Sequence, residues 1–331
     1  MAFTPKHILV TGGAGFIGSW LVKGLIEQCP QAHITTLDAL TYAGNVANLG
    51  DVMKHGRHSF VQGDIADTQI VQDLFEHSSF DAVINCAAET HVDRSIADAT
   101  PFLRSNVLGT GVLLEAARKC WQNTPDISRC RFLQVSTDEV YGSIDAPGAF
   151  TETSPLAPNS PYSASKAGAD LLVQSYGATY GLPVLISRCT NNYGPNQYPE
   201  KLLPVIIGKA MAHEPLPIYG DGQNVRDWLH VRDHVRGIIT ILTHGTLGEV
   251  YNIGGNNEWS NVALVRRVLD VLGKPHELMT FVPDRPGHDR RYALDASKLS
   301  GQLGWQPMEN FQEGLVETIA SMAPSASLAV Q

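Results

Sequence analysis

The sequence lacks the features that would anchor the protein in a membrane or join it by disulfides. Its 331 residues contain no apolar run near the ~18 residues that span a bilayer. The first residues, MAFTPKHILV, lack the long apolar core of a secretory signal. The five cysteines are scattered, odd in number and never at CxxC spacing, which disfavours disulfides and structural zinc. We therefore expect a cytoplasmic protein without a metal site.

Positive charge is also scarce. The chain has 24 lysines and arginines against 33 aspartates and glutamates, which gives a formal net charge of -9. It contains no run of lysine or arginine, so neither nucleic acid nor an anionic membrane is an expected partner. An anionic small molecule would have to meet a local basic pocket.

Short apolar runs alternate with longer amphipathic ones over about the first 190 residues. Because the short runs are apolar on both faces, they indicate a parallel sheet covered by helices. The expected strands are 7–10, 33–38, 59–65, 81–88, 131–137 and 183–189. Proline and glycine then become dense, and the rhythm breaks.

The predicted fold class is therefore α/β, with a Rossmann-type doubly wound parallel sheet and a smaller C-terminal α/β domain. We expect the nucleotide-binding domain to comprise residues 1–190 and about 223–250. Residues 191–222 and 251–331 would form the substrate domain.

The segment VTGGAGFIGS carries the first chemical motif, after an expected strand and at the start of an apolar helix. Gly13, Gly15 and Gly18 have GxGxxG spacing, and Gly12 begins an overlapping GxxGxxG. Such glycines let the backbone approach a pyrophosphate at a helix N-terminus, although tight structural turns use them too. Asp38 ends the next strand 20 residues beyond Gly18, where a carboxylate binds a ribose 2'-hydroxyl. Since this acid disfavours a 2'-phosphate, the pattern predicts NAD rather than NADP.

Tyr162 and Lys166 lie four residues apart in SPYSASKAGAD and would share one face of a helix. A cation beside a phenol favours the phenolate, so Lys166 would lower the pKa of Tyr162. The phenol could then take a proton from a sugar hydroxyl, with Thr137 holding the same hydroxyl. An isolated YxxxK would be a helix-surface pair, but its place after a nucleotide-binding half favours the catalytic interpretation.

Asp138 and Glu139 stand side by side in STDEVYG, where a buried strand should end. Adjacent strand residues point to opposite faces, so both acids can reach one crevice only if the chain curls there. The carboxyl ends of such strands are where open α/β sheets bind ligands. The plainer alternative is a strand-end turn in which Asp138 caps the next segment.

Ten segments between about residue 7 and residue 318 resemble the dTDP-glucose 4,6-dehydratases, a family of extended short-chain dehydrogenases/reductases. They are TGGAGFIGS, LDALTYAGNVANL, GDIAD, AAETHVDRSI, STDEVYG, YSASKAGAD, RCTNNYGPNQYPEKLLP, LPIYGDGQNVRDWLHVRDH, YNIGGNNEWSN and DRPGHDRRYALD. The glycine motif and YxxxK are common to the superfamily. The TDE triplet, the NNYGPNQYPEKL loop and DRPGHDRRY are far more restrictive.

The resemblance implies a lyase that uses tightly bound NAD and recycles it within each turnover. Enzymes of this family oxidise carbon 4 of the glucose, eliminate the 6-hydroxyl as water and return the hydride to carbon 6. The product from dTDP-glucose is dTDP-4-dehydro-6-deoxy-D-glucose. By resemblance, Asp138 is the acid and Glu139 the base of the elimination, with Thr137 beside Tyr162 at the 4-hydroxyl. Relatives are commonly homodimers through helices like those expected at 101–120 and 162–180.

The remaining site residues are carried over from matching motif positions. The expected cofactor residues are Gly12, Gly15, Phe16, Ile17, Gly18, Asp38, Leu40, Thr41, Asp64, Ile65, Cys86, Ala87, Ala88, Glu89, Ser105, Tyr162, Lys166 and Asn192. The expected substrate residues are Thr90, Thr137, Asn191, Lys201, Leu202, Pro217, Ile218, Tyr219, Arg226, Asn261, Asp284, Arg285, Pro286, Gly287 and His288. Arg226 and Arg285 would supply the local positive charge for a diphosphate.

Three other functions compete with this interpretation. A nucleotide-sugar 4-epimerase would share the cofactor motif and YxxxK but would have no evident use for Asp138 and Glu139. A UDP-glucose 4,6-dehydratase would use the same acids and differ only in base recognition, where RCTNNYGP favours the thymidine type. A non-catalytic NAD-binding regulator would be expected to have lost its reactive residues. All five are present in this chain: Thr137, Asp138, Glu139, Tyr162 and Lys166.

Overall fold

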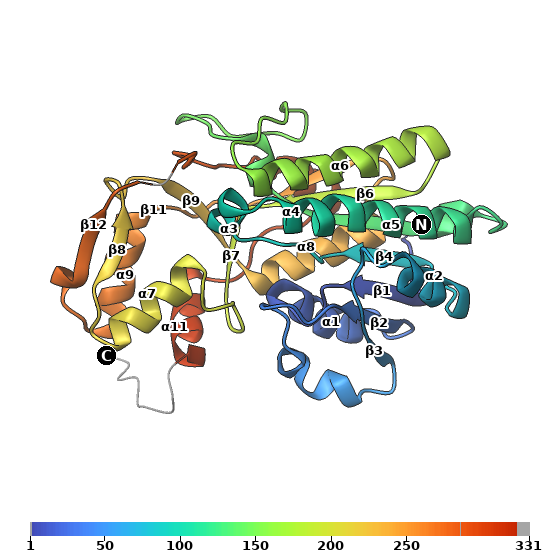
Figure 1. Cartoon of the computed structure of the whole chain (residues 1–331), viewed down its shortest axis with the longest axis horizontal. Coiled ribbons are helices and arrows are strands. Elements are labelled where there is room, and N and C mark those ends of the chain that lie inside the picture. The colour runs from blue at the N-terminus through green and yellow to red at the C-terminus, as the bar shows by residue number, and fades with distance from the viewer. Residues whose placement is uncertain (1, 285, 323–331) are drawn as a thin grey trace.

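A seven-stranded parallel sheet lies at the centre of the larger of the two parts of the molecule (Figure 1). The computed structural model describes residues 2–284 and 286–322. The strand order is β10-β6-β5-β4-β1-β2-β3, and every neighbouring pair is parallel. The strands are β1 (His7–Thr11), β2 (His33–Asp38), β3 (His58–Gln62), β4 (Ala82–Asn85), β5 (Arg131–Thr137), β6 (Val184–Cys189) and β10 (Val250–Ile253). The chain order reverses between β1 and β4, which is where such sheets open a ligand crevice.

Helices cover both faces of this sheet because alternate strand residues point to opposite sides. In β1, Ile8 and Val10 pack into one core cluster with α1 and α8, whereas Leu9 packs into the other with α2, α5 and α6. These helices are α1 (Phe16–Gln28), α8 (Val231–His244), α2 (Thr68–His77), α5 (Thr110–Trp121) and α6 (Pro161–Tyr180). The predicted doubly wound α/β class is confirmed.

Two of the predicted strands were too long. The runs 59–65 and 81–88 leave the sheet at Gln62 and Asn85, although the second run stays apolar through residues 86–88. The following residues, 63–65 and 86–88, line a pocket at the carboxyl edge of the sheet. An apolar pocket wall and a buried strand thus produce the same sequence pattern.

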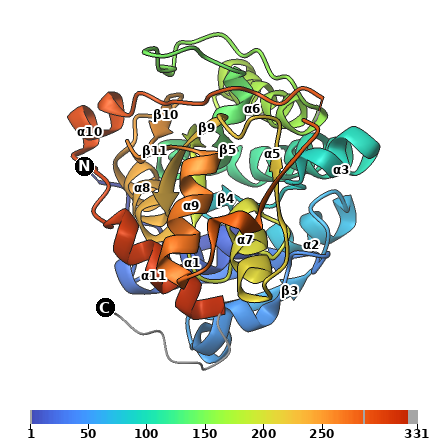
Figure 2. The ribbon, with the colours of Figure 1, turned by 90° about the vertical axis from the view of Figure 1, so that its left-hand side faces the viewer.

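A smaller body of short strands and helices lies beside the carboxyl edge and has its own apolar core. It contains a three-stranded sheet, β11-β9-β7, and a two-stranded one, β12-β8. Figure 2 shows α7, α9 and α11 side by side over these strands. The elements are β7 (Asn191–Tyr193), α7 (Leu202–Met211), β8 (Leu216–Tyr219), β9 (Val225–His230), β11 (Glu258–Ser260), α9 (Asn261–Leu272), β12 (Met279–Val282) and α11 (Phe311–Met322).

The predicted domain bounds remain a prediction. The division at about residue 250 falls at the start of β10, whose residues 251–253 pair with β6 in the seven-stranded sheet. Strand β9, within the segment 223–250, pairs with β7 and β11 of the smaller body. Short helices α3 (Val92–Ala97), α4 (Thr100–Phe102) and α10 (Ser297–Leu303) complete the chain, with a π-helical stretch, Leu103–Gly109, between α4 and α5.

A buried ion pair ties the sheet to α6. Arg188 on β6 donates from Nε to Asp170 Oδ2 at 2.9 Å, and both side chains are almost fully buried. Arg188 Nη1 also donates to the hydroxyl of Tyr141 at 2.8 Å. The Tyr141 hydroxyl in turn donates to Asn252 Oδ1 on β10 at 2.9 Å. These bonds hold the ends of β5, β6 and β10 together with the helix that carries Tyr162 and Lys166.

Candidate active site

The glycine-rich loop between β1 and α1 packs its own backbone too closely to accept side chains. Gly12 has a φ of +67°, and a Cβ there would lie 2.8 Å from the Cα of Ala87. A Cβ on Gly18 would lie 2.1 Å from the carbonyl oxygen of Gly12. Gly15 is the N-cap of α1, so the free N–H groups of the helix's first turn lie at the glycine-rich loop. This arrangement fits a pyrophosphate at a helix N-terminus.

Asp38 is held in place at the end of β2. Its Oδ2 accepts a hydrogen bond from the backbone N–H of Ala14 at 2.9 Å, and its Oδ1 accepts one from Leu40 at 2.8 Å. Burial raises the pKa of Asp38, while these two backbone bonds act to lower it. The carboxylate therefore stands beside the glycine loop, as a partner for a ribose hydroxyl requires.

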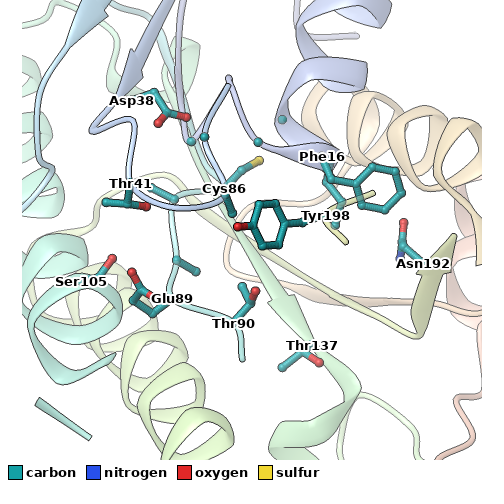
Figure 3. Close-up of a pocket in the computed structure, with 18 of the residues that line it drawn as sticks. Phe16, Asp38, Thr41, Cys86, Glu89, Thr90, Ser105, Thr137, Asn192 and Tyr198 are labelled. Carbon is teal, nitrogen blue, oxygen red and sulfur yellow. The ribbon is translucent and has the colours of Figure 1, made fainter. Parts of the chain in front are cut away.

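One pocket along the carboxyl edge gathers most of the predicted cofactor residues (Figure 3). Those that line it are Gly12, Gly15, Phe16, Ile17, Gly18, Asp38, Thr41, Asp64, Ile65, Cys86, Ala87, Ala88, Glu89, Ser105, Tyr162 and Asn192. Leu40 and Lys166 are not among the lining residues of the described chain. Leu40 instead donates to Asp38, and Lys166 Nζ donates to the carbonyl oxygen of Val135 at 2.7 Å.

The predicted substrate residues separate into two groups. Thr90, Thr137, Asn191 and Lys201 line the same pocket as the cofactor residues. The second group lies in the smaller body outside that pocket. Its members within the described chain are Leu202, Pro217, Ile218, Tyr219, Arg226, Asn261, Asp284, Pro286, Gly287 and His288. Arg285 lies outside the described residues.

Contacts within the second group bring distant segments together. His288 Nδ1 lies 2.6 Å from Asp284 Oδ1, and its ring meets that of Tyr219 edge-on at 6.2 Å. Arg226 is buried, donates to the carbonyl oxygen of Asp289 at 2.9 Å and acts electrostatically on Asp138. Through Arg226, the second group therefore reaches the neighbourhood of Asp138.

The two neighbouring acids both line the pocket because the chain turns where β5 ends. Residues Asp138–Tyr141 form a short 3₁₀ helix directly after Thr137. The cap of this turn is Thr137, whose Oγ1 accepts from the backbone N–H of Glu139 at 3.3 Å. The predicted curl is confirmed, and Asp138 is not the cap that the plainer alternative required.

Asp138 has the environment of a neutral acid. It is buried, and its Oδ1 accepts a hydrogen bond from the Thr137 hydroxyl at 3.1 Å. Burial and then the charge of Glu139 raise the pKa of Asp138 well above its ordinary value. The Thr137 hydrogen bond and Arg226 oppose this shift less strongly. Two adjacent carboxyls with unequal burial can thus hold different protonation states.

Tyr162 stands at the N-terminal end of α6, in hydrogen-bond contact with Thr137. The prediction that Lys166 lowers its pKa is wrong in this structure. Burial, followed by the charge of Glu139, raises the pKa of Tyr162 well above its ordinary value. Lys166 is itself buried, which lowers its pKa.

Several pocket residues were missed by sequence reasoning. Gln197, Tyr198 and Glu200 belong to the restrictive NNYGPNQYPEKL loop, from which only the two ends, Asn191, Asn192, Lys201 and Leu202, were selected. His234 on α8 also lines the pocket, with Nδ1 2.9 Å from Asn192 Oδ1. Burial lowers the pKa of His234 to about 3. His234 is the last residue of the quoted segment LPIYGDGQNVRDWLHVRDH, from which only Pro217, Ile218, Tyr219 and Arg226 were selected.

Within residues 2–284 and 286–322, no group of three or more His, Cys, Asp or Glu is placed to hold a metal ion. No helix in that part of the chain has both the length and the apolar character to cross a membrane.

A doubly wound sheet with a glycine-rich nucleotide loop, an acid at the end of β2 and YxxxK on α6 defines an extended short-chain dehydrogenase/reductase. The family model for GDP-mannose 4,6 dehydratase matches residues 9–318. A dTDP-glucose 4,6-dehydratase of Xanthomonas campestris pv. campestris is 52% identical, over 94% of this chain and 91% of the relative. One of Salmonella typhimurium is 46% identical, over 94% and 91%.

Solved structures agree with these matches. The dTDP-glucose 4,6-dehydratase DesIV of Streptomyces venezuelae, solved with NAD bound, has a TM-score of 0.90 and 48% identity, covering 95% of this chain and 96% of that one. A UDP-glucose 4-epimerase of Thermotoga maritima has a TM-score of 0.85 but only 30% identity, over 95% and 98%. The chain belongs to the family of dTDP-glucose 4,6-dehydratases.

Replacing Gly18 with alanine should weaken the binding of NAD. The new Cβ would meet the Gly12 carbonyl, and forced overpacking of this kind costs about 1–3 kcal/mol. We expect NAD affinity to fall at least about ten-fold. Titration of NAD into the stripped protein measures it. Gly208→Ala, on α7 with open space around it, is the matched control, and equal NAD affinity in both variants would contradict the assignment.

Proposed function

We propose that the protein is a hydro-lyase that converts dTDP-glucose into dTDP-4-dehydro-6-deoxy-D-glucose and water, with NAD recycled in each turnover. The observation that carries this proposal is the pair Asp138 and Glu139, which lines the same pocket as Tyr162 and the glycine loop. The close relatives bear the same activity in their names, and related structures contain NAD.

The competing functions have less support. The epimerases among the similar structures are 28–30% identical to this chain, against 46–52% for the dehydratases. Epimerisation also gives no role to a neutral acid beside an ionised one. The segment RCTNNYGP resembles the thymidine type, and the named relatives are dTDP-glucose 4,6-dehydratases. A silent regulator would not need five intact reactive residues in and beside the pocket.

The proposed chemistry begins at the sugar 4-hydroxyl. When bound, NAD would supply the hydride acceptor, and the positive charge of its oxidised ring would favour the phenolate of Tyr162. Tyr162 takes the hydroxyl proton, while Thr137 orients the same hydroxyl. Lys166 Nζ donates to the Val135 carbonyl oxygen, and this bond ties the helix that carries Tyr162 to β5.

The elimination follows from the acidity of carbon 5 once carbon 4 is a carbonyl. Glu139, as carboxylate, removes the carbon 5 proton. Asp138, kept neutral by burial and by repulsion from Glu139, donates its proton to the departing 6-hydroxyl, which leaves as water. Arg226 and the other residues of the second group would bind the nucleoside diphosphate.

The activity is tested by product identification. Purified protein given dTDP-glucose and UDP-glucose in competition should form the 4-keto-6-deoxy sugar from dTDP-glucose, with a mass loss equal to one water. Because the hydride returns to the sugar, absorbance of free NADH should not grow with turnover. Mass spectrometry and the absorbance trace together decide, and NADH formed in step with product would refute internal hydride return.

Asp138→Asn combined with Glu139→Gln should separate oxidation from elimination. Both substitutions keep the side-chain size but remove proton transfer, which typically contributes about 10²–10⁴-fold in rate. Bound cofactor should still be reduced in a single-turnover absorbance experiment, while water loss slows by about that factor. Tyr162→Phe is the contrasting variant, because it should suppress the reduction itself. Unimpaired dehydration in the double variant would overturn the roles of both acids.

We also propose that the protein works as a homodimer through the faces of α5 and α6. Leu103, Leu108, Leu171 and Tyr180 are each more than half exposed on or beside these helices. A shallow groove between them is lined by Val107, Val112 and Leu172 among others. Large apolar side chains clustered on a surface mark interaction sites.

The expected cytoplasmic location stays a prediction.

Substituting Leu108→Glu together with Leu171→Glu should convert the dimer into a monomer, since each charge would be buried without a partner. Light scattering after size-exclusion chromatography measures the mass. Met308→Glu places the same charge on another highly exposed apolar residue and should leave the dimer intact. A wild-type protein that elutes at 35.9 kDa would contradict the proposed dimer.

A further inference from the structure

The loop between β7 and α7, residues 194–201, crosses from the smaller body to the cofactor pocket. Gln197, Tyr198, Glu200 and Lys201 of this loop line the pocket, and Figure 3 shows Tyr198 among the residues around it. Hydrogen bonds at both ends fix the loop to the larger body. Trp20 Nε1 donates to the Pro195 carbonyl oxygen at 2.9 Å. Lys201 Nζ donates to the Thr90 carbonyl oxygen at 2.7 Å.

Between these two ends, Arg94 on α3 contacts both the loop and the segment that follows β2. Its guanidinium lies 3.9 Å from the ring centroid of Tyr42, which follows β2. Its Nη2 lies 2.9 Å from Glu200 Oε2, as an ion pair without hydrogen-bond alignment. Tyr42 also meets Tyr198 edge-on, with centroids 5.4 Å apart. We call Tyr42, Arg94, Tyr198 and Glu200 the clasp.

The charges of the clasp depend on one another. The Glu200 side chain is only 14% exposed, and besides Arg94 it has His91 Nε2 at 3.9 Å. Burial, Glu89 and Glu200 raise the pKa of Tyr42, which keeps its phenol neutral. Removing Arg94 would leave the carboxylate of Glu200 buried beside Glu89 without its nearest cation, and such a charge is strongly unfavourable.

The clasp joins three segments that contribute lining residues to the pocket. Thr41, Ala43 and Gly44 line it next to Tyr42, and Glu89 and Thr90 line it just before α3, which carries Arg94. Within the described chain, neither Tyr42 nor Arg94 lines the pocket, so both act by positioning the segments that do. The joined segments therefore carry lining residues of the pocket that also holds Asp38 and Tyr162, where the dinucleotide would be bound.

We propose that the clasp closes the 194–201 loop over the bound cofactor and retains its reduced form between the two hydride transfers, with Arg94 as the residue that holds the clasp together. The proposal rests on the proposed function, because only a reaction that returns its own hydride requires such retention. If the reduced cofactor left at this stage, the sugar would remain a 4-ketone without the hydride that carbon 6 must still receive.

The direct test is the dissociation rate of NADH from Arg94→Ala. Protein loaded with NADH is mixed with excess NAD, and the fall of NADH fluorescence gives the rate. Loss of one partly exposed ion pair and one cation–π contact should speed dissociation about ten-fold. Arg94→Lys, which keeps a charge but not the planar stack, should give an intermediate rate.

Lys298→Ala is the matched control. Lys298 also combines an ion pair, to Glu249 at 2.7 Å, with a cation–π contact to Tyr251 at 4.6 Å, away from the pocket. Its NADH dissociation rate should equal that of the wild type. Arg94 variants that release NADH no faster than this control would overturn the proposal. Because this assay contains no sugar, it remains decisive even if dTDP-glucose proves not to be the substrate.

A second readout reports retention during turnover. Lactate dehydrogenase and pyruvate in the reaction oxidise any NADH that escapes. With substrate deuterated at carbon 4, the wild type should carry the label to carbon 6 of the product regardless of this trap. Arg94→Ala should lose deuterium from the sugar together with the escaping reduced cofactor and accumulate the sugar that has lost water but not regained hydride. Full label retention in this variant would also refute the proposed role, whereas a merely less stable fold would lower turnover without diverting the label.

Discussion

The buried ion pair between Arg188 and Asp170 is the interaction on which the geometry of the site depends. It connects β6 to α6, and through Tyr141 it reaches the turn that follows β5. Breaking a buried pair of this kind costs about 3–5 kcal/mol because one charge is left uncompensated. The catalytic turn and the helix with YxxxK are therefore held at a fixed distance by an interaction that takes no part in the chemistry.

That fixed geometry explains how two neighbouring carboxyls can have opposite tasks. Asp138 and Glu139 share a turn, yet the raised pKa of Asp138 arises mainly from burial and only then from Glu139. Thr137 serves both sides of the arrangement, since it caps the turn and also contacts Tyr162. With the proposed roles, oxidation and elimination would use adjacent residues of one strand end, which would keep the reacting carbons of a single sugar within reach of all of them.

Much of the fold could be predicted because its pattern is local. Alternation of apolar runs indicated the sheet, and the glycine spacing indicated the nucleotide loop before any contact was known. The limits were also physical. The strand end at Asn85 was misplaced because the pocket wall that follows it is as apolar as a strand. The pKa of Tyr162 was misjudged because burial and the charge of Glu139 come from the tertiary structure and not from the i, i+4 spacing.

The separation of the predicted substrate residues into two groups bears on how such a protein can change. The residues around Tyr219, Arg226 and His288 belong to the smaller body, whereas the carboxyls and the glycine loop belong to the larger one. Within the described chain, neither strand of the pair β8-β12 contributes a lining residue to the pocket of the larger body. Recognition of a nucleotide can therefore diverge by gradual substitution in one body, while selection keeps the reaction centre of the other constant.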